Sequence, residues 1–182
     1  MRRGFKAEAE RTSAEVRSSL GVRETERLPL DQLAKTLGAE LRSAAELVDI
    51  SRLEEIERIQ PGAFSACTFE IGTRRVVVWS PLSTPGRITS DVAHELAHLL
   101  LKHSVQEVQT VGGLTFFGCD PDEEQEANWL AGCLLLPRKL LVAELRRGSS
   151  AADVAEKYKV SIQMANYRMR VTGAMRQTQG RQ

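Results

Sequence analysis

The segment DVAHELAHLLLKH, residues 91–103, constrains the fold of this chain more than any other part of the sequence. Its apolar residues recur at helical spacing, and His94 and His98 lie one helical turn apart. Positions i and i+4 share one helix face with Cβ atoms about 5–6 Å apart, so two imidazoles can reach a single Zn²⁺. Polar groups inside an apolar helix are costly to bury without such a partner. We therefore expect a buried helix over residues 87–102 that carries a metal site.

The glutamate between the histidines indicates hydrolytic chemistry. Glu95 lies about 100° round the helix from His94, so it can reach a water molecule on the metal without binding the metal itself. Zn²⁺ lowers the pKa of such a water to about 7, and Glu95 would take its proton as the water attacks a carbonyl carbon. The proton would then pass to the leaving amine. A helix that merely buries two hydrogen-bonded histidines is the structural alternative.

A catalytic zinc site needs a third protein ligand and one open position for water. His103 lies about 140° from His98 round the helix and cannot bind the same ion unless the helix ends first. Cys119 could bind zinc, but it stands alone in an expected loop. The best candidates lie in DEEQEANWLAGCLLLP, residues 122–137, which follows a strong helix start at Asp120-Pro121.

This second helix offers a ligand and a group to orient it. One stripe of the helix holds Glu124, Asn128, Ala131 and Leu135, beside Gly132, which permits close approach of another helix. Glu124 as ligand and Asn128, one turn on, as an orienting group would complete the site. Glu126 lies about 200° from Glu124 and would face away.

The remaining pattern predicts an α+β fold. The segments AFSACTFEI and RRVVVWS flank Gly72-Thr73 and are rich in β-branched and aromatic residues, which predicts a hairpin at the centre of a small sheet. A short strand is expected at 39–42, a loop or second hairpin at 104–118, and helices at 5–20, 30–37, 120–136, 137–148, 150–158 and 161–170. Residues 43–60 have apolar residues at helical spacing among many charges, which makes them hard to place. We expect a small twisted sheet whose hairpin packs against the histidine helix and a second, glutamate-bearing helix, with further helices at both termini.

Composition excludes several classes of protein. The 182 residues suit one globular domain, and a net charge of +1 gives no overall field for nucleic acid or membrane. Residues 1–20 lack the apolar core of a signal peptide, and the longest apolar run, Trp129–Leu136, is far shorter than the about 20 residues of a bilayer span. Three cysteines, an odd count without paired spacing, favour a reducing compartment. A cytoplasmic location without membrane contact is expected.

The layout resembles the ImmA/IrrE family of zinc metallopeptidases. The resemblance rests on the hairpin ending VVVWS, on RITSDVAHELAHLLLKH and on EQEANWLAGCLLLP, and covers roughly residues 10–170. It implies a zincin-like fold with His94, His98 and Glu124 as metal ligands and Glu95 as catalytic base. Two apolar positions depart from the family pattern: Leu136, where Met often precedes the proline, and Trp129-Leu130, where the aromatic more often stands second. Neither change bears on the metal.

The resemblance also implies a domain plan and a substrate. Residues 1–172 are expected as a single metallopeptidase domain with N-terminal helices at 5–38, a catalytic core at 39–137 and C-terminal helices at 138–172, followed by a flexible polar tail at 173–182. Members of the family are associated with site-specific cleavage of helix-turn-helix transcriptional repressors, often in stress responses, so a similar protein partner is expected here. A cytoplasmic protease of broad specificity would endanger its own cell, which also favours a narrow substrate range.

The C-terminal helices leave a second function open. Residues 157–182 contain six Lys or Arg and no acid, and two short helices about a KVS turn loosely resemble a helix-turn-helix whose Arg168 and Arg170 could contact phosphate. We favour the interpretation that these helices pack on the core through Val154, Tyr158, Val160, Ile162 and Met164. A DNA-binding regulator and a metal-bound interaction module without turnover are the alternatives. For the group that stabilises the oxyanion, His103, Tyr158 and Tyr167 are the polar candidates.

Overall fold

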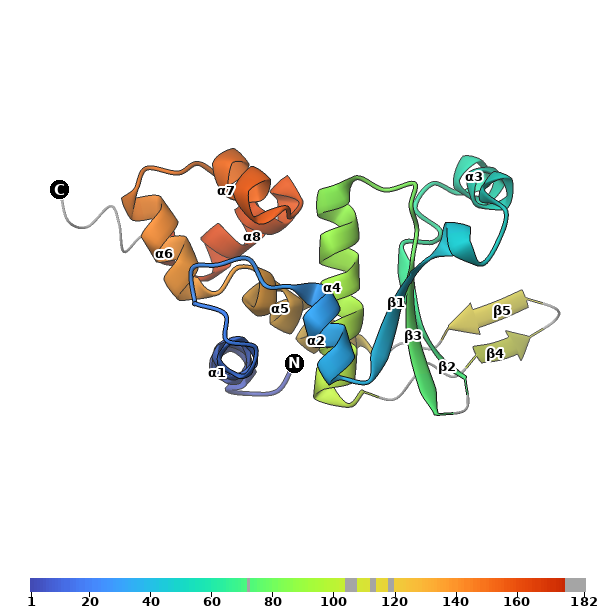
Figure 1. Cartoon of the computed structure of the whole chain (residues 1–182), viewed down its shortest axis with the longest axis horizontal. Helices are drawn as coiled ribbons and strands as arrows, with labels where there is room; N and C mark the ends of the chain where they lie inside the picture. Colours follow the sequence, from blue (N-terminus) through green and yellow to red (C-terminus); the bar gives the residue numbers. More distant parts are fainter. Residues whose placement is uncertain (72, 104–107, 112–113, 118–119, 176–182) are drawn as a thin grey trace.

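The computed structural model describes residues 1–71, 73–103, 108–111, 114–117 and 120–175. Over these residues the chain has an α+β fold, with eight α-helices, a mixed three-stranded sheet and a separate two-stranded pair (Figure 1). The helices are α1 (Phe5–Ser19), α2 (Leu30–Thr36), α3 (Ile50–Ile59), α4 (Pro85–Leu101), α5 (Pro121–Leu135), α6 (Arg138–Arg146), α7 (Ala151–Tyr158) and α8 (Ile162–Val171), with a 3-10 helix, η1 (Ala44–Glu46). The strands are β1 (Ala39–Ser43), β2 (Ala66–Ile71), β3 (Arg74–Trp79), β4 (Val108–Val111) and β5 (Leu114–Phe117). The α+β class expected from the sequence is confirmed.

The three-stranded sheet separates a large core from a small one. β3 lies in the middle, parallel to β1 and antiparallel to β2. Side chains alternate between the two faces of a strand. Val77 is fully buried in the large core, on the side of α4, whereas Val76 and Val78 pack with Leu53 of α3 on the other side. The sheet therefore lies between α4 and the η1–α3 segment (Figure 1).

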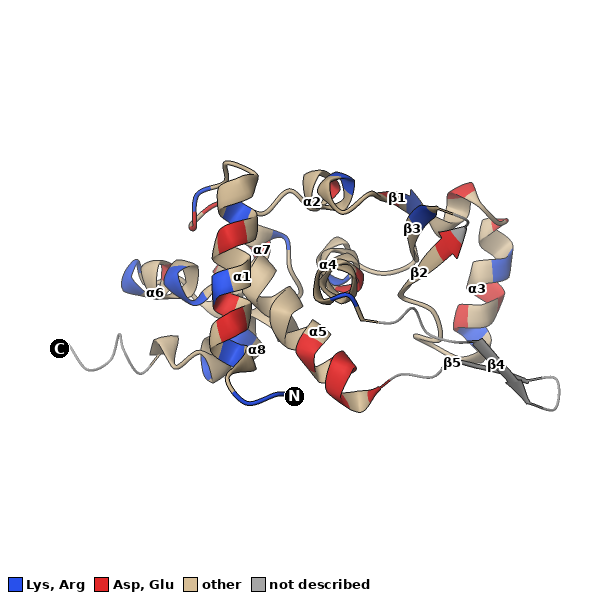
Figure 2. Cartoon of the chain, turned by 90° about the horizontal axis from the view of Figure 1, so that it is seen from below, with Lys and Arg blue, Asp and Glu red and all other residues tan. Residues whose placement is uncertain are grey.

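Helix α4 is the central element of the large core, and α5 packs across it (Figure 2). Its buried face carries two fully buried alanines, Ala93 and Ala97, and α5 faces it with Ala127 and Ala131. Small residues at such a crossing let two helix backbones approach closely, so that side chains from both helices can converge. This crossing brings together the two segments that the sequence predicted to hold a metal.

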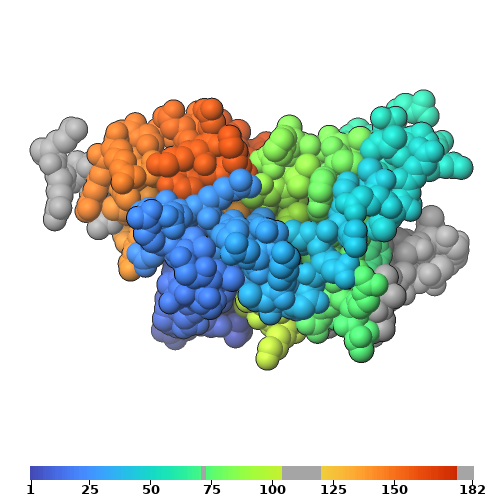
Figure 3. Space-filling model, in the orientation of Figure 1, coloured from blue at the N-terminus to red at the C-terminus, as the bar shows by residue number. Residues whose placement is uncertain are grey.

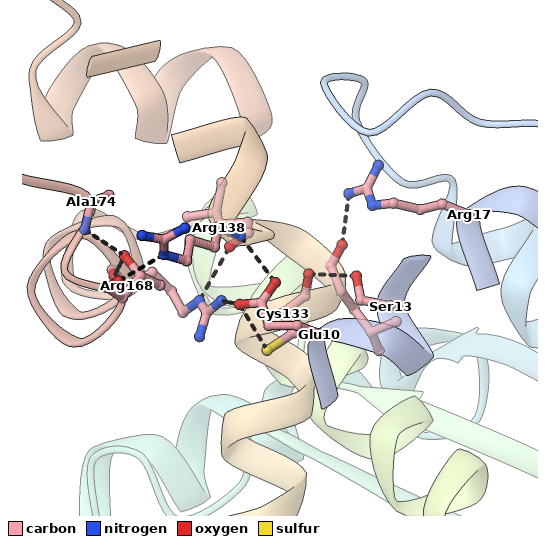
Figure 4. Close-up of polar contacts among 10 residues, drawn as sticks. Glu10, Ser13, Arg17, Cys133, Arg138, Arg168 and Ala174 are labelled. Carbon is pink, nitrogen blue, oxygen red and sulfur yellow. Dashed lines mark hydrogen bonds and ion pairs between the residues drawn. The ribbon is translucent and has the colours of Figure 1, made fainter. Parts of the chain in front are cut away.

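The carboxyl end of α5 is buried, and side chains from other helices satisfy its carbonyl groups (Figure 4). Ser13 donates to the Cys133 carbonyl at 2.7 Å, Arg17 to the Leu134 carbonyl at 2.7 Å, and Arg168 to the Leu136 carbonyl at 3.2 Å. The last carbonyls of a helix lack intrahelical partners and attract positive charge. This explains why two arginines, Arg17 and Arg168, are almost completely buried.

Glu10 of α1 connects this capped end to the C-terminal helices. It accepts a hydrogen bond from Arg168 Nη2 at 2.6 Å and another from the Arg138 backbone N–H, the first of α6, at 3.1 Å (Figure 4). The blue N-terminal residues accordingly lie directly against the orange and red C-terminal residues in Figure 3. Segments at the two ends of the sequence therefore form one packed region.

Two glycines mark close approaches of the C-terminal helices to the central pair. A Cβ on Gly132 would lie 2.6 Å from Cδ of Arg168. Gly132 was expected to permit close approach of another helix, and that neighbour is α8. A Cβ on Gly86, in the first turn of α4, would lie 2.6 Å from the carbonyl oxygen of Val160 in the α7–α8 turn. The absence of side chains at both positions allows α8 to lie beside the α4–α5 crossing.

The expected secondary structure agrees with the observed elements. Each helix predicted from the sequence is present with ends that differ by no more than two residues, and the strand at 39–42 and both hairpins are present. The segment that resisted placement, 43–60, contains η1 and α3, where Leu53 is buried but Ile56 and Ile59 are exposed. None of the described helices combines the length and apolar character needed to cross a membrane. Most of the tail expected at 173–182 lies outside the described residues, as does Cys119.

Candidate metal centre

The side chains of His94, His98 and Glu124 converge where α4 and α5 cross. The two histidine Nε2 atoms lie 3.0 Å apart, and the Glu124 carboxylate oxygens lie 3.2 Å from His94 Nε2 and 3.1 Å from His98 Nε2. Among the described residues, this is the group of three potential ligands whose donor atoms all lie within 4.8 Å of one another. The structure thus brings together the three residues that the sequence proposed as a ligand set.

The spacing of these donor atoms fits a single ion of the size of zinc. Ligand atoms about 2.0–2.2 Å from one tetrahedral ion lie about 3.3–3.5 Å from each other. The observed separations of 3.0–3.2 Å are close to that range. Two neutral imidazoles and one carboxylate also form the donor set of catalytic zinc sites, which leave a fourth position open. The residues present therefore fit the metal that the pattern predicted.

Local sequence explains why Glu124 lies at the start of its helix. Asp120 caps α5 by accepting a hydrogen bond from the Asp122 backbone N–H at 2.8 Å, and Pro121 occupies the first helical position. Glu124 then falls in the first turn, where the helix dipole favours negative charge. Figure 2 shows acidic residues gathered at this end of α5. The same cap fixes the register that points Glu124 at α4.

His98 is held in the uncharged form that binds metals. Burial and the neighbouring His94 lower the pKa of His98 and Glu124 raises it, and together these effects bring the pKa to about 4. When its Nε2 atom is free to bind a metal, a neutral imidazole carries its proton on Nδ1. His98 Nδ1 lies 3.0 Å from Nδ1 of His103, which can accept that proton in a hydrogen bond. By contrast, Nδ1 of His94 is buried with no hydrogen-bond partner among the described residues.

His103 reaches His98 because α4 ends just before it. The helix stops at Leu101, and Lys102 adopts a left-handed conformation with φ of 56°. The chain turns back, so the His103 backbone N–H bonds to the His98 carbonyl at 3.1 Å. From the sequence, His103 was expected to reach the metal only if the helix ended first. The helix does end, and the ring contacts a proposed ligand from behind.

Glu95 lies on the sheet side of the site, in contact with β2. Thr68 donates a hydrogen bond from Oγ1 to Glu95 Oε2 at 2.7 Å. Burial raises the pKa of Glu95, and the Thr68 hydrogen bond and the charge of His94 reduce that effect. A carboxylate made more basic by burial suits the role of a general base. Thr68 could not be identified from the sequence, because a hairpin pattern does not indicate which helix residue a strand side chain will contact.

A groove with a volume of about 640 Å³ opens beside the three converging side chains. Its walls come from α4, α5 and α8. The residues that line it include His94, Glu124, Asn128, Gln163, Met164 and Tyr167. Tyr167 meets the edge of the Trp129 ring, with centroids 6.3 Å apart. Trp129 in turn lies beneath the Lys6 ammonium, 4.2 Å from its centroid, so this departure from the family pattern supports the groove wall.

The other candidate residues of the sequence lie at separate positions. Asn128 is exposed at the groove, and its side-chain amide donates to the backbone carbonyl of Glu124 at 2.8 Å rather than to its carboxylate. Glu126 is not part of the group formed by His94, His98 and Glu124, as expected, and accepts a hydrogen bond from the Arg2 backbone N–H at 2.8 Å. Tyr158 is buried, with its hydroxyl 2.9 Å from the Glu144 carboxylate. Of the two tyrosines considered for the oxyanion, Tyr167 is the one that lines the groove.

The C-terminal helices pack on the core, as the favoured interpretation predicted, except at Ile162. Val154, Tyr158 and Val160 are buried as predicted, whereas Ile162 is half exposed. Arg168, suggested as a phosphate contact, is completely buried and pairs with Glu10 at 2.6 Å. A guanidinium in that position is needed to cap α5, so it cannot reach a nucleic acid.

Comparison with known proteins agrees with the geometry of the site. The chain matches the family model of the IrrE N-terminal-like domain, a peptidase family, over residues 56–170. This range contains α4, α5 and all of α8 but its last residue, and it begins later than residue 10, from which the resemblance was expected to extend. No curated protein matches the chain. The family match covers more than half of the sequence, and the chain therefore belongs to the ImmA/IrrE family of metallopeptidases.

Proposed function

We propose that this protein is a zinc-dependent endopeptidase in which His94, His98 and Glu124 hold the ion. The observation that carries the proposal is the convergence of two imidazoles and one carboxylate within 4.8 Å, next to a partly buried glutamate, Glu95. Zinc is favoured over magnesium or calcium because two of the three donors are imidazole nitrogens, whereas those harder ions prefer oxygen ligands.

The residues around the ion would divide the work of hydrolysis. Bound zinc supplies Lewis acidity, which makes a water molecule more acidic and polarises a carbonyl group. Glu95 accepts a proton from the attacking water and then delivers it to the leaving amine. His103 keeps His98 in the tautomer that presents Nε2 to the ion. Asn128 is proposed to orient the first turn of α5 through the Glu124 carbonyl.

The proposed substrate is a helix-turn-helix transcriptional repressor, cut at one or a few sites in the cytoplasm. Membership of the ImmA/IrrE family supports this substrate class. The groove beside Glu124 offers both polar and apolar contacts to a peptide, since Asn128 and Gln163 line it together with Met164 and Tyr167. In the helix-turn-helix alternative, α8 would be the recognition helix that contacts DNA. Gln163, Met164 and Tyr167 of α8 instead line the groove, which favours the peptidase over a DNA-binding regulator.

The test is cleavage of a defined repressor. Zinc-loaded protein is incubated with the helix-turn-helix repressor encoded nearest to its own gene, and the fragments are identified by mass spectrometry. The wild type should give one or a few specific cuts. Glu95→Gln should retain zinc and lose cleavage by about 10²–10⁴-fold, the usual contribution of a general base. An intact repressor, with the protein folded and zinc-loaded, would instead favour a non-catalytic interaction module.

Metal content separates the roles of the two glutamates. Glu124→Ala should lose zinc as well as cleavage, because it removes a ligand. Glu123→Ala, one residue earlier in the first turn of α5, is the matched control and should keep both. Equal zinc loss in Glu95→Gln and Glu124→Ala would show that the roles are wrongly assigned.

A further inference from the structure

We infer that Thr68 of β2 is a positioning residue that holds the Glu95 carboxylate in the orientation needed for proton transfer. The inference rests on the proposed function, since it assumes that Glu95 is the general base. Its basis is one contact between the sheet and the histidine helix. Thr68 Oγ1 donates to Glu95 Oε2 at 2.7 Å, across 27 residues of sequence.

Thr68 is partly buried on the face of the sheet that lies toward α4. On β2, Cys67 packs toward the small core on the α3 side, so strand alternation turns Thr68 to the α4 side. Thr68 pairs directly with Val77, which is fully buried on that same side. A valine would have the same shape as threonine and would suit this apolar face equally well. Packing on this face does not require the hydroxyl, and its hydrogen-bond partner among the described residues is Glu95.

The contact also leaves the rest of the carboxylate available. Among the described residues, no hydrogen-bond donor contacts Glu95 Oε1, whereas Oε2 is held by Thr68. A glutamate side chain has three rotatable bonds, and a general base is effective only within hydrogen-bond reach of the proton it takes. Because one oxygen accepts a hydrogen bond from Thr68 of β2, the positions open to the other oxygen are restricted.

The decisive comparison uses three variants. Thr68→Val removes the hydroxyl and keeps the shape, and Thr68→Ser keeps the hydroxyl and removes the methyl group. Thr89→Val is the matched control, because Thr89 is a buried threonine of α4 whose hydroxyl bonds to the Pro85 carbonyl at 3.0 Å, away from Glu95. All three should bind one equivalent of zinc, measured by mass spectrometry under native conditions.

Kinetics with the cleaved substrate should separate positioning from binding. A hydrogen bond to a charged group corresponds to a factor of about 10–100 in rate, so Thr68→Val should lose that much kcat with KM within about twofold of wild type. Thr68→Ser should recover most of the kcat, and Thr89→Val should match wild type. The inference is overturned if Thr68→Val keeps the wild-type kcat, or if Thr68→Ser falls as far as Thr68→Val.

A second readout does not depend on turnover. Acetohydroxamate chelates zinc and gives up a proton as it does so, and a correctly placed carboxylate can accept that proton. Its Kd, measured by calorimetry on the zinc-loaded proteins, should rise about tenfold in Thr68→Val and stay near wild type in Thr68→Ser and Thr89→Val. If the wild type binds acetohydroxamate but cuts no repressor, the substrate proposal fails while the Kd values still test Thr68. If the wild type binds no zinc, the proposed function and this inference are both overturned.

Discussion

At the scale of single residues, the proposed ligand His98 depends on a side chain that contacts its other ring nitrogen, Nδ1. His103 Nδ1 lies 3.0 Å from His98 Nδ1, on the opposite side of the ring from the Glu124 carboxylate. Loss of such a supporting contact commonly weakens metal binding by about 10–100-fold. His103→Phe should therefore raise the zinc Kd by about that factor, measured by competition with a chelating dye. Lys102→Gln, at the exposed neighbouring position, should leave the Kd unchanged, and an unchanged Kd in His103→Phe would remove His103 from the site.

At the scale of the helix, the buried end of α5 depends on donors from α1 and α8. Arg17 donates to the carbonyls of Glu26 and Leu134 at 2.8 and 2.7 Å, so its loss would leave buried acceptors without partners. Arg17→Met should lower the free energy of unfolding by about 2–4 kcal/mol, measured by urea denaturation. Arg11→Met, on the exposed face of α1, should change it by less than about 0.5 kcal/mol. Equal effects of the two substitutions would show that the cap contributes nothing.

The elements themselves were predictable because their signals are local. The Asp120-Pro121 start of α5, the Pro137 that ends it and the i, i+4 histidines are all read within a few residues of sequence, and they place three proposed ligands on two helices. Contacts between distant segments left no such signal. Thr68 meets Glu95 across 27 residues and Arg168 meets Glu10 across 158, so both depend on how the helices pack. The alternative in which Arg168 contacts phosphate stayed open because the sequence records the charge of Arg168 but not the acid on α1 that pairs with it.

At the scale of the whole molecule, stability should depend on pH through a buried carboxylate that joins the C-terminal helices. Burial raises the pKa of Glu144, but hydrogen bonds from Lys157, Tyr158 and Ser149 outweigh it and lower the pKa to about 2. The unfolded value is about 4.3, so the stabilisation is complete above that pH and is lost as the pH falls toward 2. It amounts to about 2–3 kcal/mol, and Glu144→Gln should be less stable at pH 7 with a flatter dependence of unfolding free energy between pH 5 and about 2. Parallel pH profiles for wild type and Glu144→Gln would contradict this assignment.

Calorimetric unfolding tests whether the chain forms one domain or two. The large core contains residues from Phe5 to Ala174, and N-terminal and C-terminal segments are in direct contact (Figure 3). We propose on this basis that the expected domain, residues 1–172, together with the buried Ala174, unfolds in a single transition with equal calorimetric and van't Hoff enthalpies. Two separate transitions would favour an independent C-terminal unit.

The central claim is that α4 and α5 together hold one zinc ion, and anomalous diffraction at the zinc absorption edge tests it most directly. Crystals of the zinc-loaded protein should give one anomalous peak within about 2.0–2.2 Å of His94 Nε2, His98 Nε2 and a Glu124 carboxylate oxygen. The Glu95 carboxylate should lie beyond bonding distance of the ion, with one oxygen still bonded to Thr68. A peak elsewhere in the molecule, or one more than about 3 Å from every Glu124 oxygen, would contradict the proposed ligand set.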